Sequence, residues 1–221
     1  MTRLLILIIA CFVSQTFAQT SFKKVVFLGN SITKHGPKAD IDWSGNWGMA
    51  ASAEAKDYAH VFTASLAQKQ GSTPVILVKN IADFERAHQG YDFSTKLKEA
   101  IDFKSDLIVL AISENVPAMK TAEEKTKFQE AVTKLLTTFK GDRKPVILVR
   151  SCFWADAAKD EALRGACAAV NGISVDISAL GKNEKNFARS ERPFKHAGVA
   201  DHPGDAGMAA IAAALMKALE K

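Results

Sequence analysis

The stretch DLIVLAI, residues 106–112, is apolar without a break from Leu107 to Ile112 and has the length of a β-strand. Similar stretches, largely apolar, are KVVFL at 24–28, PVILV at 74–78, PVILVR at 145–150 and ISVDI at 173–177. Segments with apolar residues at helical spacing separate these runs. Strands that are apolar on both faces and alternate with helices form a parallel sheet covered on both sides. The sequence therefore predicts a three-layer α/β/α fold, flavodoxin-like and doubly wound, with five parallel strands.

Local signals mark where several of the helices begin and end. Thr121 and Glu124 have the spacing of a capping box, which predicts a helix that starts beside Thr121. Asp156 and Asp205 stand where an N-cap is expected for the two helices nearest the C-terminus. A further helix is predicted over 93–103.

The composition bounds the class of protein. The chain has 221 residues, of which 48% are hydrophobic and 24% charged, with 13 Gly, 6 Pro and a net charge of +5. This excludes a disordered, fibrous or disulfide-dense protein, and it supplies enough apolar material for one substantial core. Basic residues alternate with acids, and no basic stripe is interleaved with aromatics, so we expect no nucleic-acid partner.

The N-terminal segment, residues 1–18, has the pattern of an export signal. Arg3 precedes an apolar run at 4–13, and the small residues Thr16 and Ala18 stand at the positions that a signal peptidase recognises before the cleaved bond. The run is shorter than the roughly 20 residues that span a bilayer, so we expect no stable membrane insertion after cleavage. The sequence predicts a periplasmic or secreted protein with one domain over 19–221. A lipoprotein attached through Cys11 is the less favoured alternative.

Two cysteines, Cys152 and Cys167, remain in the predicted mature domain. Cys152 ends a predicted strand, and Cys167 lies near the far end of the helix that follows. A helix rises about 1.5 Å per residue, so it carries the second thiol away from the first. We therefore expect two free, mostly buried thiols.

Three polar residues follow predicted strands or precede the last helix. Ser31 comes after the first strand in GNSIT (29–33), Asn115 follows the third strand, and His202 precedes the last helix. In parallel sheets, ligands bind at the carboxyl ends of the strands. A serine hydroxyl, a histidine base and an amide donor are the groups that acyl transfer needs. Each residue alone is more often a helix cap, a turn residue or a surface residue, so the hypothesis depends on their combination.

The combination resembles the SGNH hydrolases, also called GDSL-type esterases and lipases. Three short segments carry the resemblance, namely GNS at 29–31, SEN at 113–115 and HP at 202–203. The resemblance implies that Ser31 is the nucleophile and His202 the base. It also implies that the Ser31 N–H and the Asn115 side chain hold the oxyanion.

The chain departs from the family pattern in several places. Asn30 stands where the family usually has Asp, and Ser113 stands where it has Gly. Val199 occupies the position of the acid in the D-x-x-H pattern. The group that orients His202 is therefore open, and the candidates are Asp201, Asp176 and a backbone carbonyl.

The loop after the second strand also departs from the family, which supplies a glycine N–H there. Here the loop begins KNIADFER, residues 79–86, and no glycine occurs before Gly90. The N–H of a residue such as Ala82 is the alternative donor. A missing oxyanion donor costs about 100-fold or more in rate, so this loop bears on activity.

The three tryptophans, Trp43, Trp47 and Trp154, all fall in segments predicted at the carboxyl edge of the sheet. Indole rings at a polar cleft suit stacking on sugars, so all three are candidate substrate-binding residues. The equally weighted alternative is that they pack a long loop onto the sheet.

The sequence thus predicts an exported serine esterase for short acyl esters, such as acetyl groups on a glycan, with a small-molecule or glycan ester as partner. It predicts no cofactor and no metal, because the histidines show no metal-ligand spacing. The main alternative is a non-catalytic glycan-binding module on the same scaffold. A flavodoxin-like cofactor binder is disfavoured by the lack of a phosphate loop.

Overall fold

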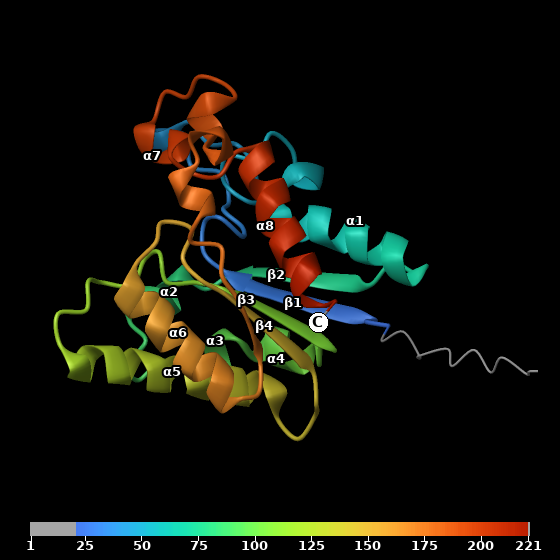
Figure 1. The fold of residues 1–221 in the computed structure, drawn as a ribbon, viewed down its shortest axis with the longest axis vertical. Helices are drawn as coiled ribbons and strands as arrows, with labels where there is room; N and C mark the ends of the chain where they lie inside the picture. The colour runs from blue at the N-terminus through green and yellow to red at the C-terminus, as the bar shows by residue number, and fades with distance from the viewer. Residues whose placement is uncertain (1–20, 221) are drawn as a thin grey trace, which may run out of the picture.

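The computed structural model describes residues 21–220. The predicted export signal at 1–18 and the alternative attachment residue Cys11 lie outside the described residues. One sheet runs through the described chain (Figure 1). Its strands are β1 (Lys24–Gly29), β2 (Val75–Asn80), β3 (Leu107–Ala111), β4 (Val146–Arg150) and β5 (Ile173–Val175).

The strand order is β2-β1-β3-β4-β5, and every neighbouring pair is parallel. This confirms the predicted doubly wound five-stranded sheet. The chain steps from β1 to β2 on one side and then returns to place β3 on the other side of β1. Such a switch in direction opens a crevice at the carboxyl ends of the two central strands. Gly29 pairs with Ala111 at these ends, so the loops after β1 and β3 emerge side by side.

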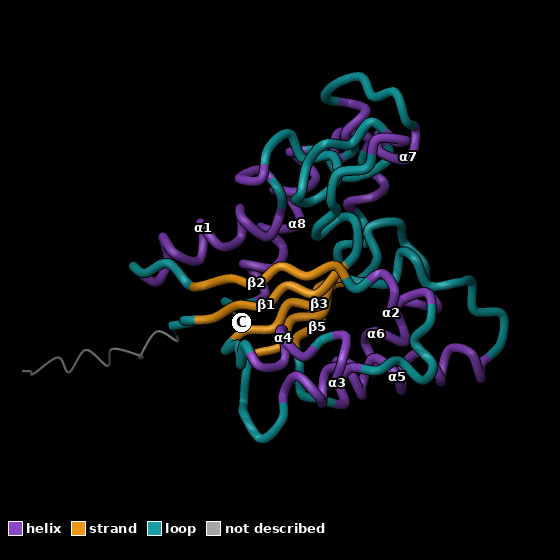
Figure 2. The backbone as a smooth tube through the Cα atoms, turned by 180° about the vertical axis from the view of Figure 1, so that it is seen from behind, coloured by secondary structure: helices purple, strands orange, loops and turns teal. Residues whose placement is uncertain are grey.

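Helices cover both faces of the sheet, as Figure 2 shows from behind. The first face carries α1 (Tyr58–Gln70) and α8 (Asp205–Ala218), whereas the opposite face carries α5 (Ala122–Lys140) and α6 (Ala157–Ala169). Shorter helices are α2 (Ala82–Arg86), α3 (Phe93–Lys96), α4 (Lys98–Asp102) and α7 (Ala197–Ala200).

The apolar strands supply both halves of the core because their side chains alternate between the two faces. Val25 and Phe27 of β1 pack in the cluster that contains Phe62 of α1. Val26 and Leu28 join the cluster on the opposite face, among the buried residues of α5 and α6. A strand with one polar face would leave one helical layer without a partner, so the unbroken apolar runs determine the three layers.

Most predicted helix ends are confirmed. Thr121 and Glu124 form the capping box of α5, and Asp156 caps α6 by accepting from the Lys159 amide. The predicted N-cap at Asp205 is wrong, because Asp205 is the first residue of α8 and Gly204 is its N-cap.

A carboxylate from elsewhere in the chain caps α8 instead. Glu191 accepts from the backbone amides of Asp205 and Ala206 at 2.8 Å each. The Asp205 side chain turns away and accepts from the amide and hydroxyl of Ser52. The sequence offered no local sign of this cap, because Glu191 precedes the helix by 14 residues.

Two predicted elements differ in extent. The helix expected over 93–103 is divided into α3 and α4 at Leu97, whose backbone leaves the helical region with φ −117° and ψ 11°. The last strand ends at Val175 rather than at residue 177, because the Ile177 amide donates to the Ser151 side chain instead of continuing the ladder.

The thiols Cys152 and Cys167 are free and buried, as predicted. Among residues 21–220, no helix is long and apolar enough to cross a membrane.

Candidate active site

Ser31 stands on a tight turn directly after β1. The amides of Thr33 and Lys34 both donate to the Asn30 carbonyl at 2.9 Å, which closes the turn. Gly29 is required there, since a Cβ would lie 1.8 Å from the Thr33 hydroxyl oxygen and 2.7 Å from a backbone carbonyl of β3. The turn leaves Ser31 half-buried, and its amide donates to no group in the described part of the chain. Its hydroxyl and amide are therefore both available at the carboxyl edge of the sheet.

The His202 imidazole reaches this serine. Its Nε2 atom lies 2.8 Å from the Ser31 Oγ atom, and its Nδ1 atom lies 2.6 Å from the Gly198 carbonyl oxygen. A carbonyl oxygen only accepts hydrogen bonds, so Nδ1 carries the proton and Nε2 presents a lone pair to the serine hydroxyl. This is the tautomer that a base for Ser31 needs. Burial lowers the pKa of His202, which keeps the ring neutral.

Of the three candidate orienters, the backbone carbonyl holds the ring. Gly198 lies in α7, which brings its carbonyl under the imidazole. The Asp201 carboxylate pairs with Arg189, and the Asp176 carboxylate accepts from Ser151 and Ser178. The valine at position 199 therefore does not leave the histidine without an orienting group.

Asn115 lies on the same cleft, and its amide is held at both ends. The Asn115 Nδ2 atom donates to Glu85 Oε2 at 2.8 Å, and its Oδ1 atom accepts from Arg86 at 3.2 Å. Ser31, Asn115 and His202 all line one cleft of about 540 Å³. The structure thus brings together the three residues that the sequence selected.

Other groups of differing chemistry complete the cleft. Polar and charged lining residues are His35, Asn80, Asp83, Arg86 and His196, and apolar ones are Ile41, Met49, Ala82 and Val199. His35 reaches the cleft from the loop after β1, and His196 reaches it from the N-cap of α7. Among residues 21–220, no group of three or more His, Cys, Asp or Glu side chains could hold a metal ion.

The loop after β2 does not offer the Ala82 amide freely. The Ala82 N–H donates to the Asn80 side-chain oxygen at 2.8 Å. The Asn80 side chain is itself held by a bond from its Nδ2 atom to the Lys34 carbonyl at 2.7 Å. The donor considered from the sequence is therefore occupied within the loop.

The tryptophans divide into two groups. None of the three tryptophans is among the described residues that line the cleft. Trp43 and Trp47 pack edge to face with ring centres 5.7 Å apart. Their indole N–H groups donate to the carbonyls of His35 and Ala51, which favours the loop-packing alternative. Trp154 is 36% exposed and contacts the His202 ring edge to face, with centres 5.5 Å apart.

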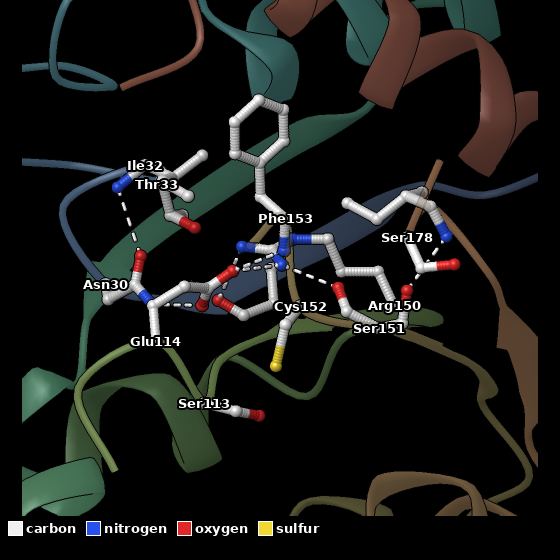
Figure 3. A network of polar contacts seen from close by, with 12 residues as sticks. Asn30, Ile32, Thr33, Ser113, Glu114, Arg150, Ser151, Cys152, Phe153 and Ser178 are labelled. Carbon is white, nitrogen blue, oxygen red and sulfur yellow. Dashed lines mark hydrogen bonds and ion pairs between the residues drawn. The ribbon is translucent and has the colours of Figure 1, made fainter. Parts of the chain in front are cut away.

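A buried polar network beneath Ser31 was missed by the sequence analysis. Asn30 donates from Nδ2 to Glu85 at 3.1 Å. It also donates to Glu114 at 2.6 Å, and Glu114 accepts from Arg150 at 2.6 Å (Figure 3). Glu85 and Arg150 are fully buried. Burial, followed by the negative charge of Glu114, raises the pKa of Glu85. The one available signal was Arg150, a cation at the end of an apolar strand.

The comparisons with known proteins concern the fold. No family model and no curated protein sequence matches this chain. Among solved structures, a two-domain esterase (CEX) active on acetylated mannans is similar, with a TM-score of 0.57 and 18% identity. The match covers 89% of this chain and 48% of that one, so this chain spans about half of the esterase's length.

Two further structures agree. The same esterase co-crystallised with mannopentaose matches with a TM-score of 0.59 and 18% identity, over 89% of this chain and 48% of that one. The lipase Lip_vut3 from a goat rumen metagenome matches with a TM-score of 0.52 and 12% identity, over 88% of this chain and 96% of the lipase. The fold of this chain is thus that of solved ester hydrolases, consistent with the resemblance to SGNH hydrolases.

Proposed function

We propose that this protein is an exported serine esterase that removes short acyl groups, acetyl above all, from a carbohydrate. The observation that carries the proposal is the 2.8 Å contact between Ser31 Oγ and a His202 ring whose Nδ1 is held by a carbonyl. Ser31, His202 and Asn115 come from three separate segments and meet in one cleft at the switch point of the sheet. The similar fold of an esterase active on acetylated mannans supports the proposal.

The geometry permits a two-stage acyl transfer. Ser31 Oγ forms a bond to the ester carbonyl carbon while its proton passes to His202 Nε2, and the carbonyl electron pair moves onto oxygen. The Ser31 N–H and the Asn115 amide stabilise that oxyanion. As it collapses, the bond to the alcohol breaks, and His202 protonates the leaving oxygen. Water then releases the acyl group by the same steps, with His202 again as base.

The carbohydrate part of the proposal depends on Trp154. Its partly exposed indole ring contacts the ring of His202, which lines the cleft. Aromatic rings with one accessible face and a polar edge are suited to sugar rings. Export, which rests on the pattern of residues 1–18, would place the enzyme where polymeric glycans occur.

The test compares the wild-type chain with Ser31→Ala on p-nitrophenyl acetate and on acetylated mannan. We expect the wild type to release acetate from both and the variant to lose at least about 1,000-fold of the rate, because the nucleophile is gone. Labelling by a fluorophosphonate should occur in the wild type and be absent in the variant.

Equal hydrolysis by the two proteins would overturn the proposal. If neither protein hydrolyses either ester and both bind mannan alike, the glycan-binding module would be the better description. Hydrolysis of the small ester without release of acetate from mannan would support the esterase activity and contradict the proposed carbohydrate substrate.

A further inference from the structure

The Asn115 amide faces groups of opposite charge at its two ends. Its Nδ2 atom contacts a carboxylate of Glu85, and its Oδ1 atom contacts the guanidinium of Arg86. A carboxylate only accepts hydrogen bonds and a guanidinium only donates them. Turning the amide over would set donor against donor and acceptor against acceptor. One orientation is therefore enforced by two consecutive residues of α2.

This orientation leaves one amide hydrogen for a ligand. Nδ2 carries two hydrogens, of which one is directed to Glu85, and the other has no acceptor among the described residues. The Asn115 side chain lines the same cleft as Ser31. The guanidinium on Oδ1 also draws electron density from the amide, which strengthens its remaining N–H as a donor.

Glu85 is itself held firmly, and its position ties two loops together. The Oε1 atom accepts from Asn30, which precedes the nucleophile, and from the amides of Ser113 and Asn115. Ser113 has φ of 108°, a conformation that residues with a Cβ rarely adopt. The buried carboxylate therefore stabilises the strained turn that carries Asn115, and it fixes the turn relative to Ser31.

Asn30 makes this arrangement compatible with a second buried carboxylate. Its Nδ2 group donates to Glu85. The same group donates to Glu114, while the Oδ1 atom accepts from the Ile32 amide (Figure 3). An aspartate at position 30 would replace the donor with a third acceptor between two carboxylates. The asparagine in the GNS segment thus fits the presence of Glu85.

We propose that Glu85 and Arg86 are positioning residues, which clamp the Asn115 amide so that its free N–H faces the oxyanion formed at Ser31. The inference rests on the proposed function, because it assigns a role within that same site. Neither residue touches the reacting atoms; both act through Asn115. On this proposal, α2 holds the Asn115 side chain as an oxyanion donor. The amide of Ala82, at the start of the same helix, already donates to Asn80.

The main test is Glu85→Gln, alone and combined with Asn115→Ala. A glutamine keeps the shape of the side chain, but its NH₂ group would meet the Asn115 NH₂ group, so the clamp is lost. We expect kcat for p-nitrophenyl acetate to fall at least about 10-fold, towards the loss of about 100-fold typical of a removed oxyanion donor, with KM little changed. In the Asn115→Ala background, the same substitution should change kcat less than about 3-fold, because the group it positions is absent.

Two further variants keep the test decisive. Arg86→Met changes an exposed side chain, so it should fold normally, lower kcat in the wild type and leave the Asn115→Ala variant unaffected. Asn30→Asp should lose activity, and Asn30→Asp combined with Glu85→Gln should recover part of it, since one carboxylate is then removed. Glu161→Gln, an exposed glutamate of α6, is the matched control and should retain full activity.

The outcomes separate the two proposals. If Ser31 is inert in the wild type, the proposed function fails and this inference fails with it. If the wild type is an esterase but Glu85→Gln and Arg86→Met keep full kcat, only the clamp is overturned. The clamp is also overturned if Glu85→Gln or Arg86→Met lowers kcat by the same factor in the Asn115→Ala background as in the wild type. The two residues would then act independently of Asn115. If Glu85→Gln does not fold, the comparison of Arg86→Met in the wild type with Arg86→Met in the Asn115→Ala variant decides.

Discussion

For single residues, the proposed ester hydrolysis depends on which ring nitrogen of His202 carries the proton. A backbone carbonyl on Nδ1 fixes the tautomer as firmly as a carboxylate would, because it too only accepts. A neutral carbonyl, however, does not stabilise the imidazolium by charge. The pKa of His202 accordingly follows burial and lies below its usual value of 6.5.

This predicts the acid limb of the pH profile. The base must be neutral, and a lowered pKa keeps it neutral to lower pH. The profile of kcat/KM should therefore fall to half at a pH below 6.5, since this parameter reports the free enzyme. Initial rates in overlapping buffers, with an ester whose own hydrolysis is subtracted, measure it. A midpoint above 6.5 would indicate instead that a carboxylate raises the pKa of the ring.

At the scale of the elements, the loop that carries His202 is held where α8 begins. Glu191 accepts from the first amides of α8, and the Ala188 amide donates to the His202 carbonyl at 2.8 Å. A Cβ at Gly204 would lie 2.5 Å from the Glu191 carboxyl group, so a larger residue there would displace this side chain from the cap. The cap therefore comes from tertiary contact and not from the helix's own sequence.

The effect of this cap can be measured with Glu191→Ala. We expect the free energy of unfolding to fall by about 1 kcal/mol, which is typical for the loss of an N-terminal cap. Urea denaturation followed by circular dichroism gives the value. Glu130→Ala, on the exposed side of α5, is the control and should leave stability nearly unchanged. Equal stability of the two variants would show that water replaces the Glu191 carboxylate without cost.

At the scale of the whole molecule, one buried cation joins the carboxyl ends of three strands. Arg150 ends β4, pairs with Glu114 after β3, and Glu114 in turn accepts from Asn30 after β1. Arg150 also donates to the carbonyls of Ala111 and Ser151. The carboxyl ends of these strands are therefore joined through a pair of charges whose side chains are almost wholly buried.

Arg150→Met tests how far the sheet depends on this cation. The substitution leaves Glu114 and Glu85 buried without a cation, and we expect a loss of about 3–5 kcal/mol in the free energy of unfolding. Adding Glu114→Gln removes one of the unpaired charges and should restore part of the loss. Chemical denaturation of the single and double variants gives both values. A single variant as stable as the wild type would contradict the expected role of the pair.

The fold could be predicted from the sequence because its signals are local. An unbroken apolar run such as DLIVLAI must be buried on both faces, and parallel strands place their carboxyl ends at one edge. That reasoning, together with the resemblance to the SGNH hydrolases, selected Ser31, Asn115 and His202 from 221 residues, although each alone resembles an ordinary cap, turn or surface residue. It also predicted the capping box at Thr121 and the two free thiols.

The sheet, its two covered faces and the three polar residues at its edge could thus be predicted from the order of the amino acids. The groups that hold these residues became known from the folded chain: the Gly198 carbonyl on His202, and the Glu85 and Arg86 side chains on Asn115. It likewise separated Trp154, beside His202, from the tryptophans that pack a loop. The physical reason is that element type follows the periodicity of neighbouring residues, whereas hydrogen-bond partners are chosen by proximity in space, here across as many as 171 positions of the chain.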